Sequence, residues 1–140
     1  MTGPWTHDGE LQSLPIVANE DVVRVRRLAR ELAQRCKLSL VDQTKFITAA
    51  SELARNTLVY GGGGQARIGL VRRNGRAGAF AAFEDSGPGI PDVDLALTDG
   101  WTSGGGLGLG LSGARRLVDE FSLDTEVGRG TTVSLVKWVR

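Results

Sequence analysis

Apolar and polar residues follow two different periods along the chain, which predicts both strands and helices. Residues 11–17 alternate well enough for an edge strand, and Pro15 is compatible with that place because an edge strand leaves some N–H groups unpaired. Apolar residues then step by three and four in two stretches, which predicts two helices. The first stretch holds Val22, Val25, Ala29, Leu32 and Cys36, and the second holds Ile47, Ala50, Ala54 and Leu58.

Capping residues and glycines predict where these helices begin and end. Asn19 or Asp21 is the expected N-cap of the first helix and Ser39 that of the second, because their side chains accept hydrogen bonds from free backbone N–H groups. Glycine adopts left-handed backbone angles without steric cost, so the second helix is expected to end at residues 61–64.

The second half of the chain predicts four more strands and two helical pieces. Residues 65–72 and 77–84 are typical of strands joined by an Asn74-Gly75 hairpin turn. A weak helix around 92–99, a helix from the glycine run 103–110 to near Phe121, and strands at 122–127 and 131–139 follow. This pattern predicts an α+β two-layer sandwich, with helices on one face of a mixed, mainly antiparallel sheet. Residues 1–9 are expected to form a flexible tail and residues 10–140 a single domain.

Composition narrows the class of protein. The chain has 140 residues, 41% of them apolar, which suits one domain with a real core. The formal net charge is +1, from 17 basic and 16 acidic side chains, which argues against nucleic acid as a partner. There is neither a membrane-length apolar run nor an apolar signal-peptide core, and Cys36 is the only cysteine. We therefore expect a cytoplasmic protein with no membrane partner and no disulfide framework.

Glu52 and Asn56 form the first pair of residues with candidate chemistry. They are four apart on the second predicted helix, so their side chains project from the same face. An amide oxygen suits a hard cation such as Mg²⁺, and a carboxylate can take a proton from an attacking hydroxyl. Alone, the pair is more typical of a solvated helix surface.

Asp85, Gly87 and Gly89 directly follow an apolar strand and form the second candidate segment. A carboxylate at a strand end, followed by glycines that allow close backbone approach, can accept a hydrogen bond from an amino group such as that of adenine. Asp, Ser, Gly and Pro are also typical of a plain turn.

Glycines dominate the two remaining segments. Six of the 20 glycines lie between residues 104 and 113, alternate partly with leucine and run into a helix, where free backbone N–H groups favour an anion. Gly128, Gly130 and Thr131 then form a tight turn before the last strand, where the threonine hydroxyl can assist Asp85.

In this order the four segments resemble the ATP-binding Bergerat (GHKL) fold of gyrase, Hsp90, MutL and the histidine kinases. The chain resembles most the RsbT-type branch of anti-sigma-factor serine/threonine kinases, and the similarity extends from about residue 10 to Trp138. The matching segments are 49–56, 99–101, 105–108 and 116–121.

The resemblance implies a set of site residues. ATP would lie between the helices and the sheet, with Asp85 on the adenine amino group and Thr131 in support. Asn56 would hold Mg²⁺, and Glu52 would be the catalytic residue that acts on the substrate hydroxyl. The remaining nucleotide-binding positions implied are Gly87, Gly89, Gly104, Gly105, Gly106, Leu107, Gly108 and Gly110.

The resemblance also implies partners. The substrate would be a serine or threonine of a STAS-domain antagonist protein in a partner-switching pathway of stress or sigma-factor regulation. A PP2C-type phosphatase or a sigma-pathway regulator is a further implied partner. Some sigma-binding relatives carry an arginine in the lid that reaches the γ-phosphate, whereas residues 101–110 contain none. Either another cation, such as Arg55, does that work, or transfer is slow. The alternative is an ATP-gated binding module with little or no phosphotransfer.

Other interpretations explain less of the chain. Gly108, Gly110 and Gly113 match a dinucleotide fingerprint, but no strand is predicted before them. A gyrase- or Hsp90-like fragment and a histidine-kinase domain are not expected, since no transducing segment follows Arg140 and no phosphoacceptor helix precedes the fold. His7 is expected to be solvated and Cys36 to pack in the core, and the arginines of the first helix are expected to form a solvated face.

Overall fold

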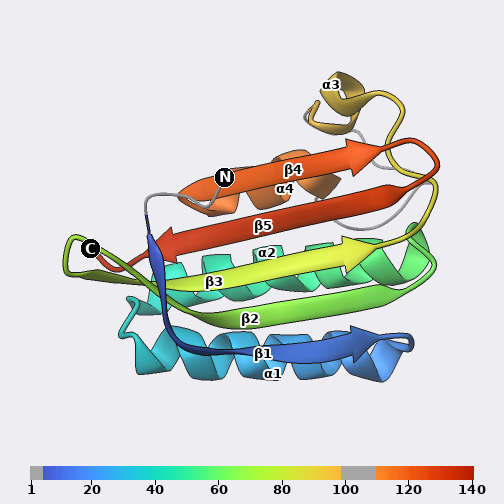
Figure 1. Cartoon of the computed structure of the whole chain (residues 1–140). Helices are drawn as coiled ribbons and strands as arrows, with labels where there is room; N and C mark the ends of the chain where they lie inside the picture. Colours follow the sequence, from blue (N-terminus) through green and yellow to red (C-terminus); the bar gives the residue numbers. More distant parts are fainter. Residues whose placement is uncertain (1–4, 99–109) are drawn as a thin grey trace.

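The computed structural model describes residues 5–98 and 110–140, which form a sheet with helices packed on one face (Figure 1). The α+β sandwich predicted from the sequence is therefore confirmed. The strands are β1 (Thr6–Ile16), β2 (Gly64–Arg73), β3 (Arg76–Asp85), β4 (Glu120–Glu126) and β5 (Gly130–Trp138). The helices are α1 (Asn19–Arg35), α2 (Leu40–Val59), α3 (Val93–Ala96) and α4 (Gly110–Leu117).

The strands lie in the order β1-β2-β3-β5-β4. Every pair among the described strands is antiparallel, so the parallel component of the expected mixed sheet does not occur there. The reason is the pair of helices between β1 and β2. Helix α1 runs along the sheet in one direction and α2 returns in the other. The chain therefore begins β2 at the end of the sheet where β1 finished, and the two strands are antiparallel.

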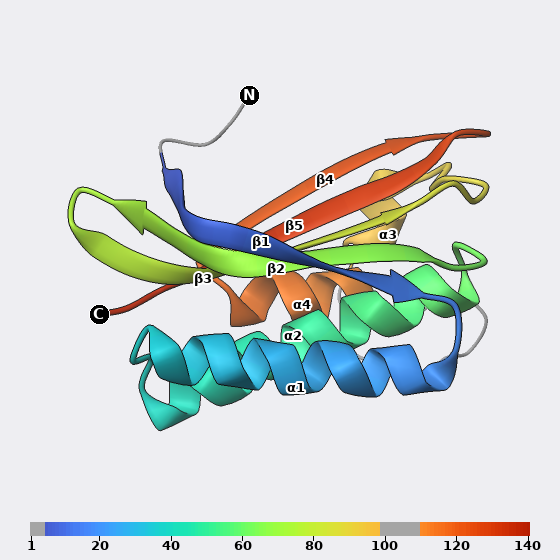
Figure 2. The same ribbon diagram turned by 60° about the horizontal axis from the view of Figure 1, so that its bottom comes forward.

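Helix α2 lies between α1 and α4 beneath the sheet (Figure 2). Alternate residues of β3 divide between the two faces: Ala79, Ala81 and Phe83 are in the core with the helices. Phe80 and Ala82 belong to a smaller apolar cluster on the other face, with Trp138, and Trp5 and Leu11 pack against that cluster. The rings of Trp5 and Trp138 meet edge to face, with centroids 6.2 Å apart.

Strand β1 begins at Thr6, inside the segment 1–9 for which a flexible tail was expected. Its first residues pair with β2 from Thr6 opposite Arg72 to Asp8 opposite Leu70, and an irregularity follows before Gln12. These residues are polar and exposed, so no alternating pattern marks them as a strand. His7 is exposed as expected, but it lies in this strand with its ring 5.0 Å from that of Phe80.

The capping predictions had mixed outcomes. Ser39 is the N-cap of α2 and accepts a hydrogen bond from the Asp42 N–H at 3.1 Å, as predicted. For α1 the prediction was wrong, because the N-cap is Ala18. Asp21 instead sits in the first turn and accepts from the N–H groups of Val17 and Ala18, at 2.9 and 3.1 Å. The hydrogen bond from Val17, with that from Ala18, holds the pKa of Asp21 below its ordinary value despite burial.

Helix α4 ends at Leu117, before the predicted end near Phe121. The helix ends there because Asp119 bonds to β5: its N–H donates to the Val136 carbonyl at 2.9 Å, and its carboxylate accepts from the Trp138 N–H at 2.7 Å. The chain then continues as β4 beside β5. Cys36 is buried as expected, and its burial raises the pKa of the thiol.

Among the described helices, none combines the length and the apolar character that a membrane crossing requires.

Candidate active site

On β3, β5 and β4 the helix-facing side of the sheet changes from apolar to polar at its last row. At the end of the sheet where β1 and β3 finish, the last-but-one row on this face is apolar and packs in the core. It consists of Leu14, Ala66, Phe83, Val133 and Leu123. The last row, in register across all five strands, consists of Ile16, Gly64, Asp85, Thr131 and Thr125. Side chains two apart on a strand share a face, so Asp85, Thr131 and Thr125 lie side by side where the core ends.

Glycines enclose the carboxylate of Asp85. Its Oδ1 accepts a hydrogen bond from the Gly87 N–H at 2.9 Å. A Cβ on Gly61 would lie 2.4 Å from Asp85 Cγ, and a Cβ on Gly87 would lie 2.8 Å from the Gly61 carbonyl oxygen. Any other residue at Gly61 or Gly87 would therefore displace the carboxylate or the turn beside it.

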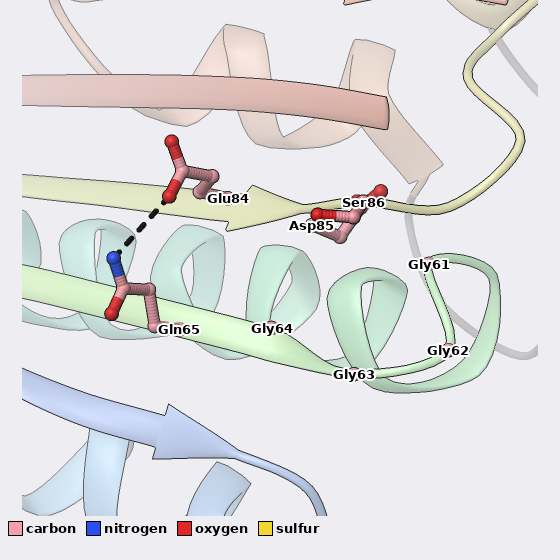
Figure 3. A pocket seen from close by; sticks show the side chains of 8 residues that line it. All are labelled: Gly61, Gly62, Gly63, Gly64, Gln65, Glu84, Asp85 and Ser86. Carbon is pink, nitrogen blue, oxygen red and sulfur yellow. Dashed lines mark hydrogen bonds between the residues drawn. The ribbon is translucent and has the colours of Figure 1, made fainter. Parts of the chain in front are cut away.

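A hollow of about 410 Å³ opens next to this carboxylate (Figure 3). The glycine turn 61–64 borders it on one side, and Asp85 and Ser86, at the end of β3, border it on the other. On its rim Gln65 Nε2 donates to Glu84 Oε1 at 3.3 Å. Glu52 and Asn56 do not line this hollow, and Gln65 and Glu84 on its rim face the side of the sheet away from the helices.

Glu52 and Asn56 are half-buried on α2. By helix geometry they lie on one flank of the buried stripe of α2, whereas Ile47 and Leu58 lie on the other. The turn after the helix joins this flank to Asp85, because the Asn56 carbonyl accepts from the Gly61 N–H at 3.1 Å. Gly61 in turn packs directly against the Asp85 carboxylate. The structure thus brings the first two predicted segments to one end of the fold.

Thr131 lies opposite Asp85 in the register of β3 and β5. Its hydroxyl oxygen is 2.8 Å from that of Thr125, which also contacts the Gly130 carbonyl at 3.1 Å. Thr125 is not among the site residues that the sequence predicts. The signal was present, since a hairpin pairs residues equidistant from its turn and Thr125 mirrors Thr131 across that turn.

Gly61, which packs on Asp85, is also not among the predicted site residues, because the sequence pattern at 61–64 indicates only the end of a helix. Gly89 is described and has a φ of +78°; a Cβ there would lie 2.4 Å from the Glu126 carbonyl oxygen. Gly110 is the first residue of α4 and has a φ of +72°. The other five predicted phosphate-binding positions lie outside the described residues; they are Gly104, Gly105, Gly106, Leu107 and Gly108.

Comparisons with known proteins agree on the fold and on the kind of domain. Residues 41–139 match the family described as histidine kinase-, DNA gyrase B-, and HSP90-like ATPase. The serine/threonine-protein kinase RsbT of Bacillus subtilis (strain 168) is 45% identical over 125 residues, which cover 89% of this chain and 94% of that protein.

Two solved structures share the fold at lower identity. The RsbU and RsbW domains of Rv1364c from Mycobacterium tuberculosis match with a TM-score of 0.63 at 19% identity, over 92% of this chain but only 32% of that one. The mycobacterial sensor histidine kinase MprB matches with a TM-score of 0.52 at 18% identity, over 96% of this chain and 99% of that one. At such identities the likeness concerns the fold alone.

Proposed function

The chain belongs to the histidine kinase-, DNA gyrase B- and HSP90-like ATPase family, and on that premise we propose that it is a protein serine/threonine kinase acting on a STAS-type antagonist protein. It transfers the γ-phosphate of ATP to a serine or threonine hydroxyl of that partner in a bacterial partner-switching pathway. The observation that carries the proposal is the placement of Glu52 and Asn56 on one flank of α2, joined through Gly61 to Asp85. The relative that is 45% identical over most of the chain supports the same activity.

Asp85 binds the amino group of adenine. One of its oxygens is already fixed by the Gly87 N–H, which leaves the second to accept from the base. Gly61 and Gly87 keep the carboxylate in this position, since a side chain at either glycine would displace the carboxylate or the turn beside it. Thr131, beside Asp85 in the last row, supports the base.

Asn56 holds the magnesium ion that accompanies ATP. Its amide is half-buried at the end of α2, and an amide oxygen is a ligand that this hard cation accepts. When bound, the ion offsets negative charge on the phosphates. The five positions outside the described residues and Gly110 complete the phosphate contacts in this proposal.

Glu52 accepts the proton of the incoming hydroxyl. It lies one helical turn before Asn56 on the same flank, so a cation held by Asn56 would bring the phosphate to be transferred near this carboxylate. A base so positioned contributes about 10²–10⁴-fold in rate. Arg55, the substitute cation considered from the sequence, is exposed on α2.

An ATP-gated binding module is the second candidate function. One observation favours it: residues 101–110 contain no arginine that could reach the γ-phosphate. Such a module would bind ATP and change partners without transferring phosphate.

Incubation with ATP labelled at the γ-phosphate and a purified STAS-domain protein tests the proposal. We expect label on a serine or threonine of the partner. The Asp85→Asn variant should bind ATP at least about tenfold more weakly, because a hydrogen bond to a charged group contributes about 1.5–3 kcal/mol. ATP binding without label transfer would support the binding module instead.

A further inference from the structure

Thr125 is a polar residue in the same row of the sheet as Asp85 and Thr131, and the proposed function gives it no role. It is half-buried in β4 at the end of the polar row, two strands from Asp85. Its hydroxyl has three polar neighbours: the Ile90 N–H at 2.9 Å, the Gly130 carbonyl at 3.1 Å and the Thr131 hydroxyl at 2.8 Å. A hydroxyl has one hydrogen to donate and two lone pairs that accept.

One arrangement satisfies all three contacts at once. Thr125 accepts from Ile90, donates to Gly130 and accepts from Thr131. In the alternative arrangement Thr125 donates to Thr131, which frees the hydrogen of Thr131 for a ligand. In both arrangements the bond to Thr125 fixes the position of the Thr131 oxygen, next to Asp85 in the same row.

The contact with Ile90 ties a second part of the site to β4. Ile90 lies in the loop between Asp85 and α3, and two further contacts hold this loop against the β4–β5 hairpin. The Gly128 N–H donates to the Pro88 carbonyl at 2.9 Å, and Gly89 packs so closely that a Cβ would lie 2.4 Å from the Glu126 carbonyl oxygen. Of the three contacts, only the one from Thr125 is made by a side chain, so it can be removed without changing the backbone.

We propose that Thr125 is a positioning residue of the nucleotide site: its hydroxyl holds Thr131 and the loop after Asp85 in the arrangement that receives the adenine end of ATP. The proposal rests on the proposed function, in which Asp85 and Thr131 meet the base. Thr125 acts through these neighbours and touches neither the phosphates nor the substrate hydroxyl. It should therefore affect how tightly nucleotide binds and leave the rate of transfer from bound ATP unchanged.

The test is an ADP titration by calorimetry without magnesium, which isolates the adenine end from the cation. Thr125→Val keeps the shape of the side chain but removes the hydroxyl, and we expect it to weaken ADP binding about tenfold. Thr125→Ser keeps the hydroxyl and should bind within about threefold of wild type. Thr132→Val is the matched control, because Thr132 is the next residue in β5 and faces the other side of the sheet. Wild-type affinity in Thr125→Val, or an equal loss in Thr125→Ser, would overturn the proposal.

A steady-state measurement separates positioning from general damage. In transfer to a STAS partner, Thr125→Val should raise KM for ATP by the same factor and keep kcat within about twofold. An equal fall in kcat would contradict the proposal. Thr131→Val removes the shared hydrogen bond from the other side, so the double variant should lose less ADP affinity than the product of the two single losses. Losses that multiply fully, in variants that melt as cooperatively as wild type, would refute action through Thr131.

Asp85→Asn, carried through the same ADP titration, distinguishes the two possible failures. Unchanged ADP binding in this variant would refute the proposed adenine site itself. Weak binding in Asp85→Asn together with wild-type binding in Thr125→Val would refute only the role of Thr125.

Discussion

At the scale of single residues, the site depends on a few polar side chains placed where an apolar face ends. Asp85 continues the alternation that buries Ala79, Ala81 and Phe83, so the strand that builds the core also aims the carboxylate. One oxygen of that carboxylate is held by Gly87, which orients it before any ligand arrives. Such preorganisation reduces the entropy lost when nucleotide binds.

Asn56 gives a prediction at this scale. Asn56→Ala should weaken binding of magnesium-ATP about tenfold or more and leave magnesium-free ATP binding nearly unchanged, because the lost ligand acts through the cation. Calorimetry with magnesium and with a chelator measures both affinities. An equal loss under the two conditions would show that Asn56 is structural.

At the scale of elements, the turn between α2 and β2 joins the two halves of the site. It ends the helix that carries Glu52 and Asn56, and it begins with the glycine that packs on Asp85. Gly64 then enters the sheet so closely that a Cβ there would lie 2.0 Å from the Glu84 carbonyl oxygen. The helix and β3 are thus fixed to each other by glycine contacts.

This turn offers a matched pair of substitutions. Gly61→Ala should displace the Asp85 carboxylate and weaken ATP binding about tenfold or more, since its Cβ would meet Asp85 Cγ at 2.4 Å. Gly62→Ala meets nothing within 4 Å and should cost only stability, about 1 kcal/mol for its positive φ. ATP titrations beside thermal melts compare the two. Similar ATP affinities in both variants would mean that Gly61 does not position Asp85.

Much of the arrangement of helices and strands was predictable from the sequence. The hairpin of β2 and β3 follows from Asn74-Gly75, whose φ angles are +51° and +79°, and α2 follows from its apolar spacing and from Ser39. The candidate residues followed from four short segments, which the resemblance ordered into one site.

What sequence did not reveal depends on contacts between distant segments. The start of β1 at Thr6 depends on pairing with β2 and on the Asp8–Arg72 ion pair at 3.0 Å, which a local pattern cannot show. The role of Thr125 requires the register of β4 on β5 and the approach of Ile90.

At the scale of the whole molecule, the two ends of the sheet differ in their chemistry. One end carries the polar row of the candidate site. At the other, the buried Lys137 lies 3.5 Å from Asp42 at the start of α2 and 3.3 Å from Asp119 before β4, with Arg140 beside both carboxylates. This ionic cluster connects the helix layer to the sheet at the end away from the candidate site.

The ionic cluster predicts a pH dependence of stability. Burial raises the pKa of Asp119, but the Trp138 N–H and the charges of Lys137 and Arg140 outweigh it, so the pKa lies below its ordinary value. A carboxyl with a lowered folded pKa adds stability above its unfolded pKa of about 3.9, and this stability is lost as pH falls through the folded pKa. Asp119→Asn should therefore be less stable at neutral pH and should lose less stability than wild type on acidification below about pH 4.

Urea unfolding between neutral pH and the acid limit measures this difference. The curves for wild type and Asp119→Asn should converge as pH falls, and ATP binding at neutral pH should be unchanged. Parallel curves would show that Asp119 titrates alike in the folded and unfolded protein.

Single-turnover phosphate transfer to a STAS partner, measured for wild type and Glu52→Gln beside their ATP affinities, tests the central claim most directly. The substitution keeps size and hydrogen bonding but removes the basic oxygen. We expect ATP affinity within about threefold of wild type and a transfer rate lower by about 10²-fold or more. Transfer at the wild-type rate in Glu52→Gln would contradict the role of Glu52 as the base, and the absence of transfer by the wild-type protein would contradict the assignment as a kinase.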